Sequence, residues 1–162
     1  MSGTKIKSLK ELRRILAGLR AKGKKVVFTN GCFDLLHYGH AKYLQDAKKK
    51  GDILVVAVNS DASVKRIKGS NRPIVGEMDR LRVIAALESV DYAVLFKEDT
   101  PLEVITSLKP DILAKGADWE KNNIVGSNIV LGYGGKVARI KLMPGRSTTN
   151  LIKKIAKNFR GH

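Results

Sequence analysis

The spacing of apolar residues changes several times along the chain, and each change predicts a new element. The first pattern has intervals of three and four residues, typical of one face of an α-helix, and consists of Leu9, Leu12, Ile15, Leu16 and Leu19. Ser8 stands before this face and Glu11 follows it by three residues, which is the arrangement of a capping box. We therefore expect an amphipathic helix that begins after Ser8 and ends near Gly23.

Short apolar runs alternate with further helical patterns along the rest of the chain. Strands are expected at residues 25–29, 53–58, 92–95, 112–114 and 136–140, and the run at 53–58 is apolar on both faces, as in a buried parallel strand. Helices are expected at about residues 39–50, across 81–87, after Thr100-Pro101, within 126–135 and at about 148–159. Residues 60–73 are polar and are expected to form a loop.

Alternation of strands and helices requires parallel pairing with right-handed crossovers. The expected fold class is therefore α/β, a Rossmann-like open five-stranded parallel sheet with helices on both faces, in a single domain. Residues 1–23 are expected to be its N-terminal amphipathic helix and residues 24–162 the remainder. Ligands of such sheets bind beyond the carboxyl ends of the strands, so the chemistry is expected in the loops that follow the strands.

The composition bears on the class of protein and on its cellular compartment. The hydrophobic fraction of 43% is that of a globular protein, and no apolar run approaches the length of a membrane span. The first residues lack the apolar core of a signal peptide. A single cysteine, Cys32, excludes an internal disulfide framework and suits a reducing compartment, so we expect a cytoplasmic protein.

The charge balance favours anionic partners. Lys and Arg total 31 against 15 Asp and Glu, a net charge of +16, which attracts either nucleic acid or small phosphorylated metabolites. Many of these cations lie on expected solvated helix faces, and charge alone does not choose between the two classes. A nucleic-acid-binding module has little other support, because no recognised binding motif is present and aromatic residues are 6% of the chain.

The loop after the first core strand contains two of the three histidines, His37 and His40. Their spacing of three residues puts both rings on one face of the first turn of the following helix. Gly39 between them permits a close approach to the backbone. A helix N-terminus favours anions, and two imidazoles placed there suit a phosphate that gains negative charge in its transition state.

Other interpretations of the two histidines remain open at this stage. A zinc pair lacks a third His or a Cys at ligand spacing, whereas a cap of the helix or a satisfied core histidine is an ordinary role. The glycine spacing of a dinucleotide-binding fingerprint is absent, and so is a Walker A loop.

Residues 31–40, Gly-Cys-Phe-Asp-Leu-Leu-His-Tyr-Gly-His, resemble the G-x-F-D-x-x-H-x-G-H signature of the cytidylyltransferase-like branch of the HIGH nucleotidyltransferase superfamily. The resemblance implies that His37 and His40 are catalytic, contacting the NTP phosphates and stabilising the pentavalent transition state. It also implies nucleotide binding by the residues around them, Thr29, Asn30, Gly31, Cys32, Phe33 and Gly39. Asp34 is assigned to binding of the second substrate. Its alternative role is to orient one of the histidines or a metal-bound water.

A second motif stands before the last expected helix. Arg146, Ser147, Thr148 and Thr149 could be ordinary helix caps, or could offer hydroxyl, N–H and guanidinium groups to phosphate oxygens. Together with Leu151-Ile152 they are similar to the S-T-T-x-I motif of the same branch, which holds the outgoing β- and γ-phosphates. The resemblance thus adds these four residues to the nucleotide site.

Between the two motifs, Arg80 aligns with the arginine that faces the phosphates in this branch and is expected to be catalytic. Relatives commonly carry a glutamate two residues earlier, where this chain has Met78. Positive charge in the expected loop at 60–73 suits the phosphates of either substrate, although it could equally be loose surface charge. The residues assigned to the second substrate, besides Asp34, are Asn59, Asp61, Lys65 and Lys68.

The resemblance extends over about residues 25–156. Segments 58–69 with Arg72-Pro73, 86–91, 98–101 and 109–119 look like the nucleotidyltransferase domain of the ADP-heptose synthesis proteins. This implies transfer of AMP from ATP to D-glycero-β-D-manno-heptose 1-phosphate, and it places Lys115, Gly116 and Asp118 beside the nucleotide. In many relatives a sugar kinase is fused to this domain; 162 residues leave no room for one, so a stand-alone form is expected.

The sibling activity, glycerol-3-phosphate cytidylyltransferase, shares both signatures, and the chemistry of these side chains does not distinguish adenine from cytosine. Mg²⁺ is expected to be bound through the nucleotide phosphates, without a metal site made of protein ligands. The expected partners are the nucleotide and the sugar phosphate, not nucleic acid or a membrane, with a homodimer as the candidate assembly.

Overall fold

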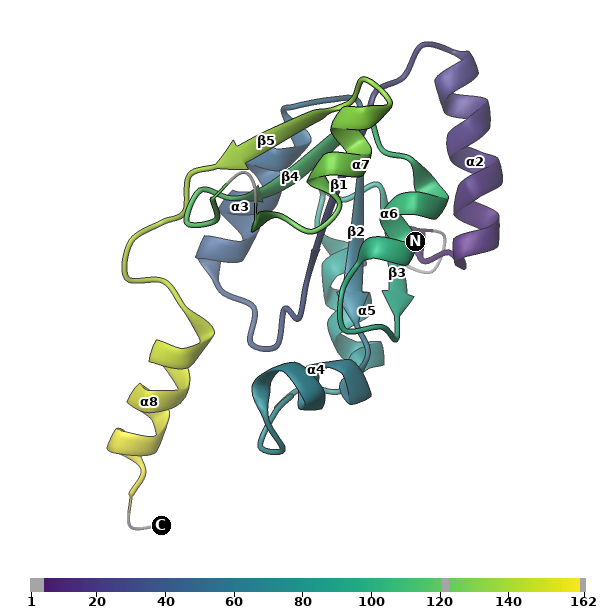
Figure 1. Ribbon diagram of the computed structural model, residues 1–162. Helices are drawn as coiled ribbons and strands as arrows, with labels where there is room; N and C mark the ends of the chain where they lie inside the picture. The colour runs from purple at the N-terminus through teal and green to yellow at the C-terminus, as the bar shows by residue number, and fades with distance from the viewer. Residues whose placement is uncertain (1–4, 121–122, 161–162) are drawn as a thin grey trace.

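A five-stranded parallel sheet forms the centre of the molecule, as predicted, and its strand order is β3-β2-β1-β4-β5 (Figure 1). The computed structural model describes residues 5–120 and 123–160; the ends of the expected domain at residues 1–4 and 161–162 lie outside the described residues. The strands are β1 (Val26–Gly31), β2 (Ile53–Asn59), β3 (Tyr92–Phe96), β4 (Ile112–Gly116) and β5 (Lys136–Ile140). Each described pairing between neighbours is parallel.

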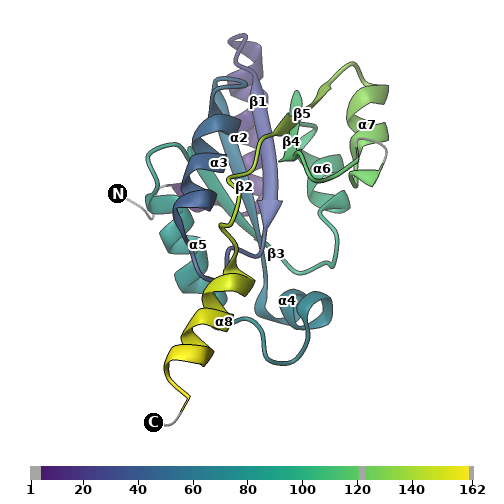
Figure 2. The ribbon, with the colours of Figure 1, turned by 90° about the vertical axis from the view of Figure 1, so that its left-hand side faces the viewer.

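Helices cover both faces of this sheet. They are α2 (Leu9–Ala21), α3 (Tyr38–Lys48), α4 (Asp61–Lys68), α5 (Glu77–Ala86), α6 (Leu102–Leu108), α7 (Ser127–Gly132) and α8 (Thr148–Asn158). Figures 1 and 2 show α3 and α5 on one face and α2, α6 and α7 on the other. Two hydrophobic clusters, one on each side of the strands, correspond to these layers. The sandwich arrangement leaves the strand ends free to carry loops.

The N-terminal helix α2 begins as its sequence predicts. The Ser8 Oγ accepts a hydrogen bond from the Glu11 N–H at 3.3 Å, and the Ser8 N–H donates to Glu11 Oε2 at 2.8 Å. Leu12 and Leu16 are fully buried, in the same cluster as Phe28 of β1. Because this helix shares its core with the sheet, we propose that it belongs to the same domain.

The expected loop at residues 60–73 is wrong in its first half, where the structure has the helix α4. The Ser60 side chain accepts from the Ser63 N–H at 3.2 Å and caps this helix. Val64 and Ser63 face the interior and are fully buried. The helix has only eight residues and buries a single turn, so its sequence has no long apolar stripe from which a helix could be predicted.

The order of the strands brings distant loops together. The chain passes from β1 outward through β2 to β3, and then returns to the other side of β1 for β4 and β5. This reversal beside β1 creates a switch point at the carboxyl edge of the sheet, where ligands of such folds bind. Beyond β5, α8 extends away from the sheet in both views (Figures 1 and 2), and all of its residues keep some exposure.

No helix within residues 5–120 or 123–160 combines the length and the apolar character that a membrane span requires.

Candidate active site

A cavity of about 630 Å³ opens at the carboxyl edge of the sheet, within the usual size range of small-molecule sites. It is lined by most of the predicted site residues: Asn30, Gly31, Cys32, Phe33, Asp34, His37, Gly39, His40, Asn59, Lys68, Lys115, Gly116, Asp118, Arg146, Ser147, Thr148 and Thr149. Thr29, Asp61, Lys65 and Arg80 are not part of the lining. The structure therefore brings the two sequence motifs into one cavity, although they stand more than a hundred residues apart.

The two histidines form a stacked pair at the start of α3. His37 is the N-cap residue in extended conformation, but its side chain makes no capping hydrogen bond. The imidazole centroids of His37 and His40 lie 3.9 Å apart with an angle of 22° between the rings. Phe33, whose φ of 48° reverses the chain, sets the edge of its ring against His40 at 5.4 Å. The rings are thus held by packing against aromatic neighbours.

Three ring nitrogens of this pair are buried without a partner in the part of the chain that the structure describes: His37 Nδ1, His37 Nε2 and His40 Nδ1. An unsatisfied buried polar atom costs about 1–3 kcal/mol, so such atoms are rare unless a ligand completes them. No group of three or more potential metal ligands occurs among residues 5–120 and 123–160. Each neutral imidazole carries one N–H donor, and phosphate oxygens in the cavity would satisfy these donors.

Burial also sets the charge of the pair. Burial, followed by the neighbouring His37, lowers the pKa of His40 to about 4. Burial, followed by the nearby positive charge of Arg146, lowers the pKa of His37 as well. Both imidazoles are therefore neutral at pH 7 in the free protein, and each offers an N–H donor to an anion.

The second motif meets the first at the start of α8. The Ser147 side chain accepts from the Asn150 N–H at 3.1 Å and so caps this helix. The Thr148 Oγ1 donates to the Leu35 carbonyl at 3.2 Å, which joins α8 to the histidine loop. Free N–H groups at this helix start face the same cavity as the imidazoles, and both helix N-termini attract anions.

Arg80 differs from its expected position facing the phosphates. The residue is 1% exposed and is not part of the cavity lining. Its Nη1 donates to the Cys32 carbonyl at 2.5 Å, its Nε to the Val75 carbonyl at 2.8 Å, and its Nη2 to Asp61 Oδ1 at 2.8 Å. The arginine thus joins the histidine loop to α4 and to the segment before α5. Asp61 is engaged in the same contact, and Lys65 is not a lining residue.

Asp34 is bound to a neighbouring loop. Its carboxylate accepts from Arg72 Nε at 2.5 Å and from the N–H groups of Ile74 and Val75 at 2.8 and 2.9 Å. Burial alone would raise the pKa of this carboxyl, but these backbone and guanidinium donors together lower it below its usual value. Asp34 therefore fixes residues 72–75 against the histidine loop.

Thr29 does not line the cavity itself but contacts Tyr43, which does. Its Oγ1 lies 2.8 Å from the hydroxyl of Tyr43, which also donates to the Ala114 carbonyl at 3.2 Å. Tyr43 lines the cavity, and burial raises the pKa of its phenol to about 12. Sequence reasoning did not select Tyr43, because a tyrosine inside an amphipathic helix has the signature of an ordinary core residue.

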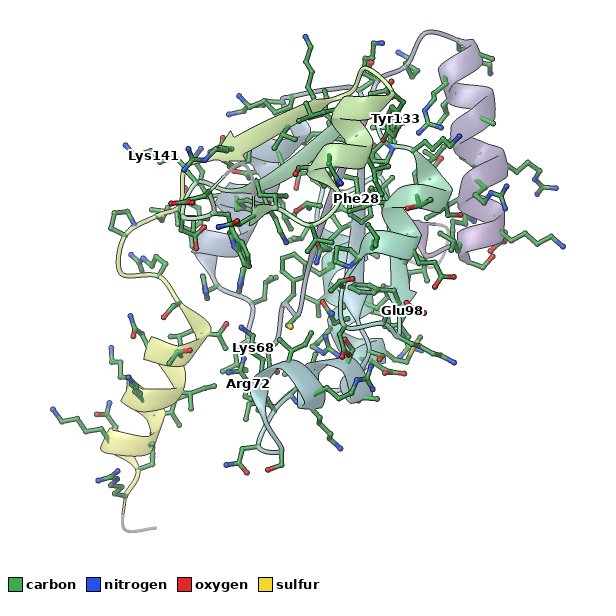
Figure 3. The ribbon with its side chains drawn as sticks, in the orientation of Figure 1. Phe28, Lys68, Arg72, Glu98, Tyr133 and Lys141 are labelled. Carbon is green, nitrogen blue, oxygen red and sulfur yellow. The ribbon has the colours of Figure 1, made fainter. Side chains whose placement is uncertain are left out.

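The histidine loop follows the central strand β1, so the other lining residues fall into two groups, one on each side of it, which we call the two lobes of the cavity. The lobe beyond β4 and β5 includes Lys115, Trp119, Leu142 and Met143, and the Lys115 Nζ lies 5.8 Å from the centroid of the indole ring. The lobe beyond β2 and β3 is polar and is lined by Asn59, Lys68, Arg72, Asp99 and Thr100, with Ile67 beside them. Figure 3 labels Lys68 and Arg72, which both lie at the α4 side of the cavity.

Comparison with known proteins identifies this arrangement. The cytidylyltransferase-like family matches residues 28–154, a range that contains the histidine loop and the start of α8. The chain belongs to the cytidylyltransferase-like family. It is accordingly a nucleotidyltransferase, as the histidine signature predicts.

Bifunctional protein HldE from Trichlorobacter lovleyi is a cytidylyltransferase-like relative with 53% identity over 158 residues, 98% of this chain and 32% of that protein. HldE from Geobacter metallireducens is 52% identical over the same shares. The chain therefore spans about a third of the length of these relatives.

Two solved structures share the cytidylyltransferase-like fold. The lipopolysaccharide core biosynthesis protein from Thermoplasma volcanium is 35% identical, with a TM-score of 0.60 over 75% of this chain and 98% of that one. A pantoate-beta-alanine ligase from Francisella tularensis has a TM-score of 0.61 at 15% identity, over 89% of this chain and 68% of that one. The second likeness is one of fold alone.

Proposed function

We propose that the protein transfers AMP from ATP to D-glycero-β-D-manno-heptose 1-phosphate and releases pyrophosphate, giving ADP-heptose. The observation that carries nucleotidyl transfer is the stacked His37–His40 pair, whose buried, unpartnered nitrogens share one cavity with the N-terminus of α8. The N–H donor of each ring is available to phosphate oxygens. The choice of substrates rests on the resemblance of segments 58–119 to the ADP-heptose synthesis proteins and on the 53% identity to HldE.

In the proposed reaction, a phosphate oxygen of the sugar phosphate attacks the α-phosphorus of ATP. The bond from the α-phosphorus to the bridging oxygen of the β-phosphate breaks, and pyrophosphate leaves with that oxygen. The nucleophile is already an anion at neutral pH, so no general base is required. The barrier consists of bringing two anions together and spreading charge over the α-phosphoryl oxygens, so positioning and electrostatics dominate.

His37 and His40 are the proposed catalytic residues. They are neutral imidazoles with depressed pKa values, and each donates one N–H hydrogen bond. Donors that are already oriented stabilise developing charge better than solvent does, because they need no reorganisation. We place the outgoing β- and γ-phosphates at the start of α8, where Arg146 adds a positive charge.

The nucleoside is proposed to occupy the lobe beyond β4 and β5. Trp119 is 47% exposed there, and Leu142 and Met143 supply apolar surface. Lys115 is held by Asn30, whose Oδ1 accepts from its Nζ at 2.9 Å, and burial lowers its pKa. The arrangement suits a flat base with polar edges, which leaves the polar lobe for the second substrate.

Mg²⁺ is proposed to bind through the phosphate oxygens of ATP, where it would neutralise their charge and orient the leaving group. The residues around the histidines fit this mode better than a protein cage. Asp34 is the carboxylate nearest the histidines in sequence, and it is occupied by Arg72, Ile74 and Val75. Hard divalent cations of this kind are usually held by substrate phosphates with few protein ligands.

The second candidate reaction is cytidylyl transfer to glycerol 3-phosphate, which the shared signatures favour equally. Pyrophosphate release with ATP, CTP and GTP, each combined with heptose 1-phosphate and glycerol 3-phosphate, separates the two. We expect turnover with ATP and heptose 1-phosphate. A strong preference for CTP with glycerol 3-phosphate would assign the chain to the sibling activity.

We propose a homodimer as the assembly and the cytoplasm as the location. Support for the dimer comes from α8, whose apolar residues Leu151, Ile155 and Phe159 remain exposed. The single cysteine supports the location. Light scattering of the wild type and of Ile155→Glu tests the dimer, and a wild-type monomer at micromolar concentration contradicts it. Nucleic-acid binding, which would weaken steeply with salt, is not expected.

A further inference from the structure

Asp99 lies in the polar lobe of the cavity, on the loop between β3 and α6. The proposed mechanism assigns it no role. Its Oδ1 accepts from Arg66 Nε at 2.6 Å, and Arg66 Nη2 donates to the Lys97 carbonyl at 2.6 Å. Its other oxygen, Oδ2, accepts no hydrogen bond from the described residues. Arg66 therefore engages one carboxylate oxygen and leaves the second available, and the side chains of both residues are about half exposed.

The loop that carries Asp99 is also tied to the end of β2. The Asn59 Nδ2 donates to Ser63 Oγ at 3.0 Å, and Ser63 Oγ donates to the Glu98 carbonyl at 2.8 Å. Asn59 and Ser63 are both buried, so this chain of hydrogen bonds is shielded from solvent. Asn59 lines the cavity, and its Oδ1 accepts no hydrogen bond from the described residues, so this oxygen is available as an acceptor.

The opposite side of the same lobe is cationic. Lys68 lines it, and Arg72 uses its Nε for Asp34 and keeps its Nη groups as donors (Figure 3). The lobe thus combines two cations with two hydrogen-bond acceptors. Cations attract a phosphate, whereas carboxylate and amide oxygens repel it and instead accept hydrogen bonds from hydroxyl groups. A ligand that satisfies both must carry a phosphate and several hydroxyls.

We propose that Asp99 determines specificity for the second substrate: its carboxylate accepts hydrogen bonds from hydroxyl groups of a polyhydroxylated phosphate ester whose phosphate lies toward Lys68 and Arg72. The inference rests on the proposed nucleotidyl transfer and names the chemical class of the second substrate that binds in the polar lobe. Asn59 Oδ1 is the second acceptor for these hydroxyls, and Arg66 is a positioning residue that orients the carboxylate.

The substitution Asp99→Asn provides a test in which two effects have opposite signs. It removes a charged hydrogen-bond acceptor, so the hydroxylated phosphate ester should bind about 10- to 100-fold more weakly. It also removes a negative charge from a phosphate-binding lobe, so inorganic phosphate should bind equally well or more tightly. Arg66→Gln should weaken binding of the hydroxylated phosphate ester by a smaller factor. Asp79→Asn is the matched control, since it makes the same charge change on an exposed face of α5.

Calorimetry is performed on the full chain loaded with α,β-methylene-ATP, or with the CTP analogue if the enzyme uses CTP. The titrants are heptose 1-phosphate, glycerol 3-phosphate and inorganic phosphate, and fluorescence of the single tryptophan, Trp119, confirms nucleotide loading of every variant. Weaker binding of the hydroxylated ester together with unchanged or tighter binding of phosphate supports the proposal. Equal weakening of both, or no change in either, overturns it.

The two proposals fail in distinguishable ways. If the wild type takes glycerol 3-phosphate and not heptose 1-phosphate, the proposed acceptor is wrong, and the role of Asp99 is decided by its effect on glycerol 3-phosphate. If heptose 1-phosphate is turned over but Asp99→Asn leaves its affinity unchanged, the reaction stands and the role of Asp99 does not.

Discussion

A Cβ on Gly39 would lie 2.9 Å from the Cβ of Arg146 and 2.9 Å from the imidazole of His37. The histidine loop and the segment before α8 therefore touch at a point where a side chain does not fit. This contact sets the distance between the two anion-binding helix ends. It also explains why a glycine separates the two histidines: the backbone of α3 must pass directly beside Arg146.

The contact makes the substitution Gly39→Ala a test of how closely the two motifs must approach. The added methyl group must displace His37 or Arg146, and misplacement of a reacting group by about 1 Å costs on the order of 10²-fold in rate. We expect kcat for pyrophosphate release to fall about 10- to 100-fold in a protein that remains folded by circular dichroism.

Gly18→Ala is the matched control for this change. Gly18 lies inside α2, and nothing lies within 4 Å of the position its Cβ would take. Alanine there should raise the free energy of unfolding by about 0.5–1 kcal/mol and leave kcat unchanged. Wild-type kcat in Gly39→Ala would contradict the close contact.

Removal of one imidazole tests the electrostatic role of the pair. His40→Ala should lower kcat by about 10²–10³-fold, the size seen when one transition-state donor is lost. Affinity for ATP, followed by Trp119 fluorescence, should change much less because the contacts at α8 remain. Tyr38→Ala, a change at an exposed position in the same turn outside the cavity lining, should keep both values. If His40→Ala folds and keeps near-wild-type kcat, the electrostatic role is wrong and the histidines have an ordinary packing role.

The depressed pKa of His40 predicts how stability depends on pH. The folded state holds this pKa at about 4 against an ordinary value of 6.5, so between these pH values the unfolded chain binds more protons than the folded one. The free energy of unfolding should therefore fall as pH drops from about 6.5 toward 4. In His40→Asn this contribution is absent, so its melting temperature should decline less from pH 7 to pH 5 than that of the wild type. Parallel declines would show that burial of His40 does not control its charge.

Arg80 should matter for stability and for the shape of the loop. Arg80→Gln leaves the Cys32 and Val75 carbonyls without their donor and breaks the pair with Asp61, which should lower the free energy of unfolding by about 3 kcal/mol. Because Arg80 is a positioning residue in this geometry, kcat should fall with little change in ATP affinity. Arg82→Gln, an exposed arginine on the same helix, should change stability by about 0.5 kcal/mol or less. A large loss of ATP affinity in Arg80→Gln, with unchanged stability, would instead favour direct contact with the phosphates.

Most elements of the fold could be predicted because their signals are local. The capping box at Ser8 and Glu11 and the fully apolar run of β2 depend on residues within one or two turns of each other, and both appear in the structure. The helix α4 was missed for the same reason. Its inward face is a single turn around Val64, and the lysines and arginine on its other faces resemble a polar loop.

The candidate site was predictable only where a motif is continuous. His37, Gly39 and His40 stand in one loop, and the loop after a strand of a parallel sheet opens at the ligand-binding edge. Tyr43, Arg72 and Asp99 carry no such signal, because they reach the cavity from a helix and from two separate loops. The direction of the Arg80 side chain was likewise undetermined, since an arginine on a helix can face phosphate or protein with the same sequence.

The sequence by itself determined the order of the elements, the parallel sheet and the family, because periodicity, caps and a continuous signature are properties of neighbouring residues. Only the tertiary structure decided that Arg80 is buried against the Cys32 and Val75 carbonyls and Asp61, that Asp34 holds residues 72–75, and that the loops after β2, β3, β4 and β5 line one cavity. Those outcomes depend on which distant elements pack together. Here β3 and β5 lie on opposite sides of β1, so the loops that follow them supply opposite walls of one cavity.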